Sequence, residues 1–346
     1  MSDIDGTKNG DSIQGTAGDD RINGKGGDDW LTGLGGDDRL YGGAGTDYLD
    51  GGLGADRLYG NAGNDNLVDE QGGADRMWGG DGNDSITVRR ASNSSTDQLR
   101  LDGEAGDDYI TYYGSYENRV TLDIAGGEGN DTITASYGTA DVDAGTGNDV
   151  IQLRYMRDGR VDAGDGDDTL TIVHPYGGQL RVDMGTGDDR VTLQPAAPYT
   201  NASYVMTLGA GQDTLALQPF SDSQVYVPNL TLTDFIGGVD GDRIDLSSYL
   251  AKGLTNWGGN NPFASGHLQL VQNGASTLLQ IDMDGEGNSW QTLATLLDVQ
   301  ASTITADNFI GGFDPSGESA SAASFEWEAI SASGPLYLDH AVAALI

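Results

Sequence analysis

The residues with the clearest potential for chemistry are aspartates that recur at a fixed interval in the first quarter of the chain. They lie nine residues apart, with a single step of ten beside Asp69, and glycines surround each of them. Carboxylate and carbonyl oxygens are the ligands that Ca²⁺ prefers, whereas zinc and copper sites favour nitrogen and sulfur. The spacing therefore predicts a series of calcium sites. The aspartates are Asp11, Asp20, Asp29, Asp38, Asp47, Asp56, Asp65, Asp75 and Asp84.

The overall charge also points to a bound cation. The chain has 346 residues, of which 54 are acidic and 17 basic, so its formal charge is −37. A compact body with this charge repels itself unless cations neutralise it. The same acidity excludes nucleic-acid binding through a basic face. The absence of cysteine excludes disulfides and thiolate metal sites, and no apolar run is long enough to span a membrane.

Each early aspartate belongs to a nonapeptide that predicts one local structure. Its glycines permit a tight turn, and one apolar residue follows the aspartate two positions later, as Leu49 and Leu58 do. Strands this short must stack to bury their apolar side chains, and a flexible linker would not keep this register. The predicted fold class is all-β: a right-handed parallel β-roll or β-helix. In residues 1–87, two nonapeptides form one turn and calcium loops line both edges.

From residue 88 the anchoring aspartates continue at longer intervals of 18 to 29 residues. Each segment contains one glycine loop, a strand, a bend and a returning strand. We therefore expect an extension of longer coils over residues 88–245, with calcium loops on one edge only. Asp102, Asp143, Asp162 and Asp183 precede these loops, either as extra ligands or caps or as solvated strand ends. The later anchoring residues are Asp108, Asp131, Asp149, Asp168, Asp189, Asp213 and Asp242.

The nonapeptide Gly-Gly-x-Gly-x-Asp-x-U-x, in which U is a large apolar residue, resembles the calcium-binding repeat of RTX proteins. Further along, Leu232-Thr233-Asp234-Phe235 and Gly241-Asp242-Arg243-Ile244-Asp245 resemble the region that follows the repeats in serralysin-type secreted proteins. The resemblance implies several bound Ca²⁺ ions and a capping region at residues 246–312. It also implies export by a type I secretion apparatus to the outside or the cell surface of a Gram-negative bacterium. The acidic tail, residues 313–346, is interpreted as the export signal.

The sequence shows no catalytic constellation. Its three histidines lie far apart, and the motifs H-E-x-x-H and G-x-S-x-G are missing. We therefore expect no enzyme. The expected role is calcium-dependent folding outside the cell and a non-enzymatic surface or matrix function, which includes S-layer-like, filament-forming or adhesive proteins. Self-association into filaments or sheets would suit that role.

An extracellular protein that binds or modifies polysaccharides is the alternative. A lyase or epimerase site could form on successive coils, although ordinary strand and bend side chains explain the same residues. The residues in question are Arg154, Tyr155, Arg157, His174 and Tyr176.

One outward face has a composition suited to a partner. Arginine occupies position 7 of every second nonapeptide, and position 9 is mainly aromatic. Because alternate nonapeptides share a face, these residues should form two parallel columns that point away from the core. Such columns suit an acidic polysaccharide, a cell-surface glycan or a second copy of the chain. Alternatively, the arginines offset loop carboxylates and the aromatics suit exposed strands. The candidate face comprises Arg21, Arg39, Arg57, Arg76, Tyr41, Tyr59 and Trp78.

Overall fold

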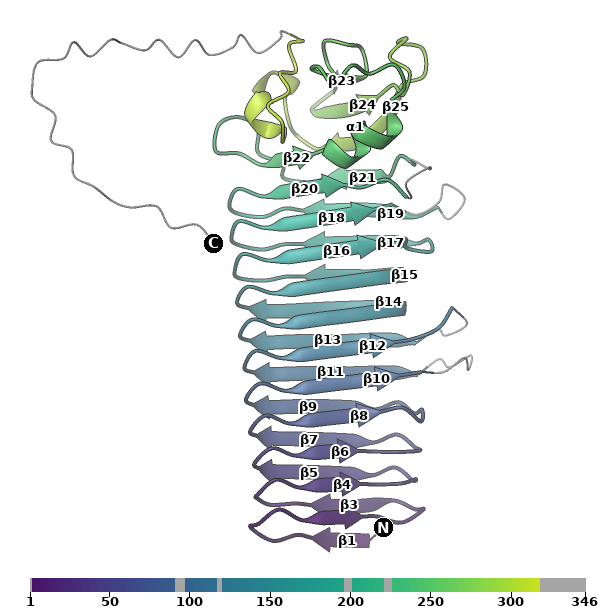
Figure 1. The fold of residues 1–346 in the computed structure, drawn as a ribbon, viewed down its shortest axis with the longest axis vertical. Helices are drawn as coiled ribbons and strands as arrows, with labels where there is room; N and C mark the ends of the chain where they lie inside the picture. Colours follow the sequence, from purple (N-terminus) through teal and green to yellow (C-terminus); the bar gives the residue numbers. More distant parts are fainter. Residues whose placement is uncertain (1, 91–96, 117–119, 196–200, 221–225, 318–346) are drawn as a thin grey trace, which may run out of the picture.

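The protein is a long column of short strands with a small cap at one end (Figure 1). The computed structural model describes residues 2–90, 97–116, 120–195, 201–220 and 226–317. The expected all-β parallel solenoid is confirmed. The expected export tail lies outside the described residues, apart from residues 313–317.

Two parallel sheets form the two faces of the solenoid. The first face contains β1 (Ser2–Asp5), β3 (Asp20–Asn23), β5 (Arg39–Ala44), β7 (Arg57–Ala62), β9 (Arg76–Asp81), β11 (Gln98–Ala105), β13 (Thr121–Glu128), β17 (Gln179–Asp183), β19 (Ser203–Thr207) and β21 (Asn229–Leu232). The second face contains β2 (Ser12–Gln14), β4 (Trp30–Thr32), β6 (Tyr48–Asp50), β8 (Asn66–Asp69), β10 (Ser85–Arg89), β12 (Tyr109–Tyr113), β16 (Thr169–Val173), β18 (Arg190–Gln194), β20 (Thr214–Leu217) and β22 (Arg243–Asp245). The longer strands β14 (Thr132–Thr146) and β15 (Val150–Asp162) contribute to both faces.

The core is a stack of apolar side chains, one from each short strand. Leu40 pairs with Leu58 and Leu58 with Met77, and all three are fully buried. Ile13 is only partly buried, because it lies in the first turn and has a neighbouring turn on one side only. The longer strands of the later coils add a second inward residue, as Leu99 and Leu101 do in β11, so the core widens there.

The two edges of the solenoid differ. We call the edge where the chain passes from the first face to the second the loop edge, and the opposite edge the far edge. The loop edge carries a glycine loop in every turn, on the left in Figure 1. Among the residues that the structure describes, the far edge carries such loops at residues 15–20, 33–38, 51–56 and 70–75. These loops need glycine: Gly54 has a φ of 131°, and a Cβ there would lie 1.9 Å from the Gly36 carbonyl oxygen.

In the later coils the far edge turns on aromatic residues instead. Three residues that pair in register across neighbouring turns are each followed directly by an aromatic residue with a positive φ between 47° and 63°. These aromatic residues are Tyr137, Tyr155 and His174. The Tyr137 and Tyr155 rings stack with centroids 5.0 Å apart, and the Tyr155 and His174 rings lie 5.9 Å apart. Stacked side chains thus accompany the sharp turns that glycine loops make in the early part.

The cap extends both faces beyond the last full turn. It contains α1 (Ser247–Gly253), β23 (Leu268–Asn273), β24 (Ser276–Ile281), β25 (Gln291–Leu296) and the short 3₁₀ helices η2 (Ala301–Thr303) and η3 (Ala306–Asn308). On the first face, β25 pairs in parallel with β21. On the second face, Phe309 forms a parallel bridge with Ile244 of β22. The buried Asn308 side chain donates to the Asp242 carbonyl oxygen at 2.8 Å, so the cap is bonded to the last aspartate loop.

Candidate calcium sites

The anchoring aspartates form two hydrogen-bonded rows, one on each edge. In both rows, the backbone N–H of one aspartate donates to Oδ1 of the aspartate one turn later, at 2.7 to 3.2 Å. The far-edge row contains Asp20, Asp38, Asp56 and Asp75. The loop-edge row contains Asp11, Asp29, Asp47, Asp65, Asp84, Asp108, Asp131, Asp149, Asp168, Asp189, Asp213 and Asp242.

The second carboxylate oxygen of most of these aspartates is buried without a donor. Among the described residues, twelve Oδ2 atoms lack a hydrogen-bond partner. A buried charged oxygen without a partner is costly, so this pattern fits oxygens that bind a cation. The twelve belong to Asp29, Asp38, Asp47, Asp56, Asp65, Asp84, Asp108, Asp131, Asp149, Asp168, Asp189 and Asp213.

The four aspartates at the ends of the rows differ, because protein groups bind their Oδ2 atoms. Thr7 donates its backbone N–H to Asp11 at 2.6 Å, and Thr16 donates in the same way to Asp20 at 2.5 Å. At the other end of the loop-edge row, the Ile236 N–H donates to Asp242 at 2.7 Å. Arg90 donates to Asp75 at the end of the far-edge row. Within the two rows, the unsatisfied carboxylate oxygens therefore belong to the aspartates that have a loop of the row on both sides.

The electrostatics of these rows disfavour ionisation when no cation is bound. Burial raises the pKa of Asp56, Asp84 and Asp108 to about 7 each. The backbone N–H that each Oδ1 accepts works in the opposite direction, and neighbouring carboxylates raise the pKa further. The buried carboxylates of the rows therefore favour binding either a proton or a cation.

The early loops bring oxygens of successive turns close to the same glycine. A Cβ on Gly24 would clash with Asp29 Oδ2 at 2.1 Å and with the carbonyl oxygen of Gly42, one turn later, at 2.6 Å, so only glycine fits there. A carboxylate oxygen and a carbonyl oxygen are both donors of the kind that Ca²⁺ binds. In the described ranges, no group of three or more His, Cys, Asp or Glu side chains is placed to hold a metal. A calcium ion here would thus be held by carboxylate oxygens together with loop carbonyls.

The residue type at the first position of the glycine loops changes along the chain. From residue 144 it carries side chains that join the core, namely Ala144, Ala163, Met184 and Leu208. The later loops are therefore more apolar on their inner side than the early ones.

Sequence reasoning missed a second, exposed ladder beside the loop-edge row. At the fifth loop position, Asn and Asp side chains accept the backbone N–H of the same position one turn later, at 2.8 to 3.1 Å. The recurrence of Asn and Asp at this position was the visible signal. The acceptors are Asp28, Asn64, Asn83, Asp107, Asn130, Asn148, Asp167 and Asp188.

On the first face, the arginines and aromatics expected to form columns lie in register. Arg39 pairs with Arg57 and Arg57 with Arg76. The Tyr41 and Tyr59 rings stack 4.9 Å apart at 5°, and the Tyr59 and Trp78 rings stack 4.7 Å apart at 2°. The described ion pairs include none at Arg39, Arg57 or Arg76.

Arg100 extends the arginine column, because it pairs with Arg76. The sequence pattern missed it, since Arg100 lies beyond the point where the repeat lengthens. Arg76, Trp78 and Arg100 line a groove of 510 Å³ at the end of the aromatic stack. Arg100 also contacts Asp102 at 2.8 Å, and Arg160 contacts Asp162 at 2.6 Å. Asp102, within β11, and Asp162, at the end of β15, therefore act as partners of exposed arginines.

The residues considered for catalysis come together only in part. The Tyr155 ring lies 5.9 Å from His174 and 5.7 Å from Tyr176, whereas Arg157 lies over Tyr116. The Nε2 atom of His174 contacts the Phe220 carbonyl oxygen at 3.0 Å, and no described contact joins this histidine to a carboxylate.

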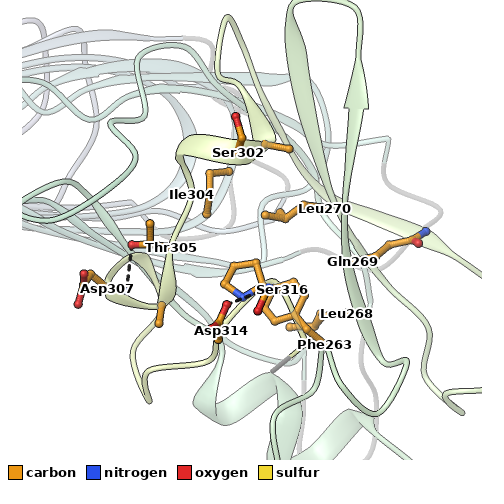
Figure 2. Close-up of a pocket in the computed structure, with 14 residues that line it drawn as sticks. Phe263, Leu268, Gln269, Leu270, Ser302, Ile304, Thr305, Asp307, Asp314 and Ser316 are labelled. Carbon is orange, nitrogen blue, oxygen red and sulfur yellow. Dashed lines mark hydrogen bonds between the residues drawn. The ribbon is translucent and has the colours of Figure 1, made fainter. Parts of the chain in front are cut away.

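The cap contains the cavity drawn in Figure 2, with a volume of 760 Å³. The described residues that line it include no histidine, lysine or arginine. It is lined by apolar side chains such as Phe263 and Leu270 and by the acidic Asp307 and Asp314.

The raised pKa values predict how metal-free stability depends on pH. Protonation stabilises the metal-free fold; this contribution is complete below the ordinary carboxyl pKa of about 4 and is lost as pH rises through about 7. In chelator, far-ultraviolet circular dichroism should therefore show more folded protein near pH 5 than near pH 8. Saturating calcium should abolish or reverse this difference, because the cation favours the ionised carboxylates. Equal folding at both pH values in chelator would contradict this prediction.

Adjacent aspartates allow a matched test of the ligands. Asp108 is buried with an unsatisfied Oδ2, whereas the neighbouring Asp107 is exposed. Asp108→Asn should lower the number of bound calcium ions by at least one, and should raise the calcium concentration needed for folding. Asp107→Asn should change neither quantity, because its Oδ1 can still accept from Asn130. Equilibrium dialysis measures both variants, and indistinguishable results would rule out the buried row as the binding site.

Comparison with known protein families matches the RTX calcium-binding nonapeptide repeat in four copies, at residues 5–40, 32–67, 71–88 and 123–151. Comparison with curated proteins finds no match. These repeats bind calcium, and several copies imply several Ca²⁺ ions. RTX repeat proteins are typically secreted, and their rolls are typically non-catalytic. None of the described helices has the length and apolar character needed to cross a membrane. The chain therefore carries RTX calcium-binding nonapeptide repeats.

Proposed function

We propose that the protein is secreted, folds on calcium outside the cell and serves there as a non-enzymatic surface or matrix component. The observation that supports this is the set of twelve buried Oδ2 atoms without donors. Calcium is scarce in the cytosol, so the acidic chain repels itself and stays unfolded for export. Outside, calcium binding supplies folding free energy, because the ions bind only the folded rows.

The proposed ligands are the sixteen anchoring aspartates of the two rows. The twelve with unsatisfied Oδ2 atoms would make the most direct contacts, and the four at the row ends would shape the terminal loops. Residues 246–312 are proposed as the cap, with the serralysin-like resemblance as support. The proposal also retains the tail as the signal for a type I apparatus of a Gram-negative bacterium.

Self-association is the proposed form of the surface role. Half-buried aromatic stacks lie on both faces of the early turns: Tyr41, Tyr59 and Trp78 on the first, and Tyr48 with the exposed Trp30 on the second, their rings 4.1 Å apart. Trp30 is 54% exposed. A patch on one face that meets a different patch on the next copy makes a contact that does not close, so it yields filaments or sheets.

The aromatic stacks provide the test of assembly. In calcium, static light scattering of the purified protein should show growth into large particles. Changing Tyr41, Tyr59 and Trp78 together to serine should abolish this growth, with calcium binding and circular dichroism unchanged. A wild-type protein that folds in calcium but stays monomeric would overturn self-assembly, and growth that survives the triple change would exclude this face.

An extracellular polysaccharide-binding role is the second candidate, and the groove beside Trp78 favours it. An aromatic ring flanked by Arg76 and Arg100 suits a sugar ring that carries a carboxylate or sulfate group. An array of acidic polysaccharides probed with wild-type and triple-serine protein separates this candidate from assembly. Release of unsaturated uronate from these polymers would instead support the lyase alternative.

A further inference from the structure

A buried arginine lies at the end of the far-edge row. Arg90 follows β10 and is only 7% exposed. Its guanidinium donates to the carboxylates of Asp69 and Asp75, the latter at 2.6 Å. It also reaches the carbonyl oxygens of Asp69 and Gly73, each at 3.3 Å. The group is thus surrounded by two carboxylates and two carbonyl oxygens.

This set of oxygens is of the kind a calcium ion takes, and it lies in line with the row. The preceding aspartates of that row, Asp38 and Asp56, have Oδ2 atoms without donors, whereas Asp75 Oδ2 binds Arg90. The additional carboxylate comes from Asp69, which ends β8 just before the loop that contains the single step of ten. Asp69 is 1% exposed, so its charge needs a partner inside the protein.

The position also marks a change in architecture. Asp75 ends the last glycine loop that the described residues show on the far edge, and three later coils turn there at Tyr137, Tyr155 and His174. A row of calcium loops that stops would leave its final carboxylate without a following aspartate of the row. An arginine that comes from the following strand supplies a cation at that point without requiring another loop.

We propose that Arg90, Asp69 and Asp75 form a cation site in which the Arg90 guanidinium takes the place of a calcium ion. Arg90 supplies the positive charge at the last aspartate of the far-edge row, and the same oxygens bind Ca²⁺ when the arginine is removed. This inference rests on calcium binding at the other loops, which is part of the proposed function.

The neighbouring arginine provides the control. Arg89 is exposed and pairs with Glu70 at 2.8 Å, outside the row. We expect Arg90→Ala to bind one calcium ion more than the wild type, and to need more calcium for folding. Arg89→Ala should bind the wild-type number, and Arg90→Lys should gain no ion because it retains the positive charge. Native mass spectrometry counts the ions, and circular dichroism follows folding across a calcium titration.

Two results would overturn the inference. One is an Arg90→Ala protein with the same calcium count and the same calcium requirement as Arg89→Ala. The other is an Arg90→Ala protein that stays unfolded at saturating calcium, while the triple change Arg90→Met, Asp69→Asn and Asp75→Asn folds with the wild-type count. A wild-type protein that binds no calcium would instead overturn the proposed function itself, and this inference with it.

Discussion

A buried aspartate recurs from turn to turn along the solenoid, and in most turns only one of its two carboxylate oxygens accepts a hydrogen bond. Its Oδ1 accepts the backbone N–H of the preceding turn, which sets the spacing and register of successive coils. Its Oδ2 faces inward without a donor in most turns. The hydrogen bond that orders the fold therefore also buries a charge that the protein does not neutralise. We therefore propose that the stability of the whole column depends on an external cation.

The rest of the architecture follows from how each edge handles this charge. The loop edge repeats the glycine loop through the longer coils, so its row reaches the cap, where Ile236 and Asn308 bond the final loop. In the described part of the far edge, Asp75 ends the last such loop. Three later coils turn there at Tyr137, Tyr155 and His174, which have positive φ and whose rings lie next to one another. A solenoid can thus exchange an ion-dependent edge for a side-chain-dependent one while both faces continue in register.

Much of this was accessible from the sequence, because the repeat fixes both the period and the residue types. The register that brings Arg57 beside Arg76 and Leu58 beside Met77 follows from two nonapeptides per turn. Other features depend on distances that the repeat does not encode. Arg100 joins the arginine column only through strand pairing across a longer coil. Likewise, Arg90 reaches Asp69 and Asp75 through the fold, from 21 and 15 residues away in sequence. The bends and the cap lack a repeat, so their contacts had no periodic signal.

Differential scanning calorimetry of the whole chain at neutral pH, with saturating calcium and with chelator, tests the central claim most directly. The account predicts a cooperative melting transition in calcium and none in chelator, because the buried carboxylates then lack their counter-ions. The same cooperative transition under both conditions would contradict it, since the rows would then be stable without any bound cation.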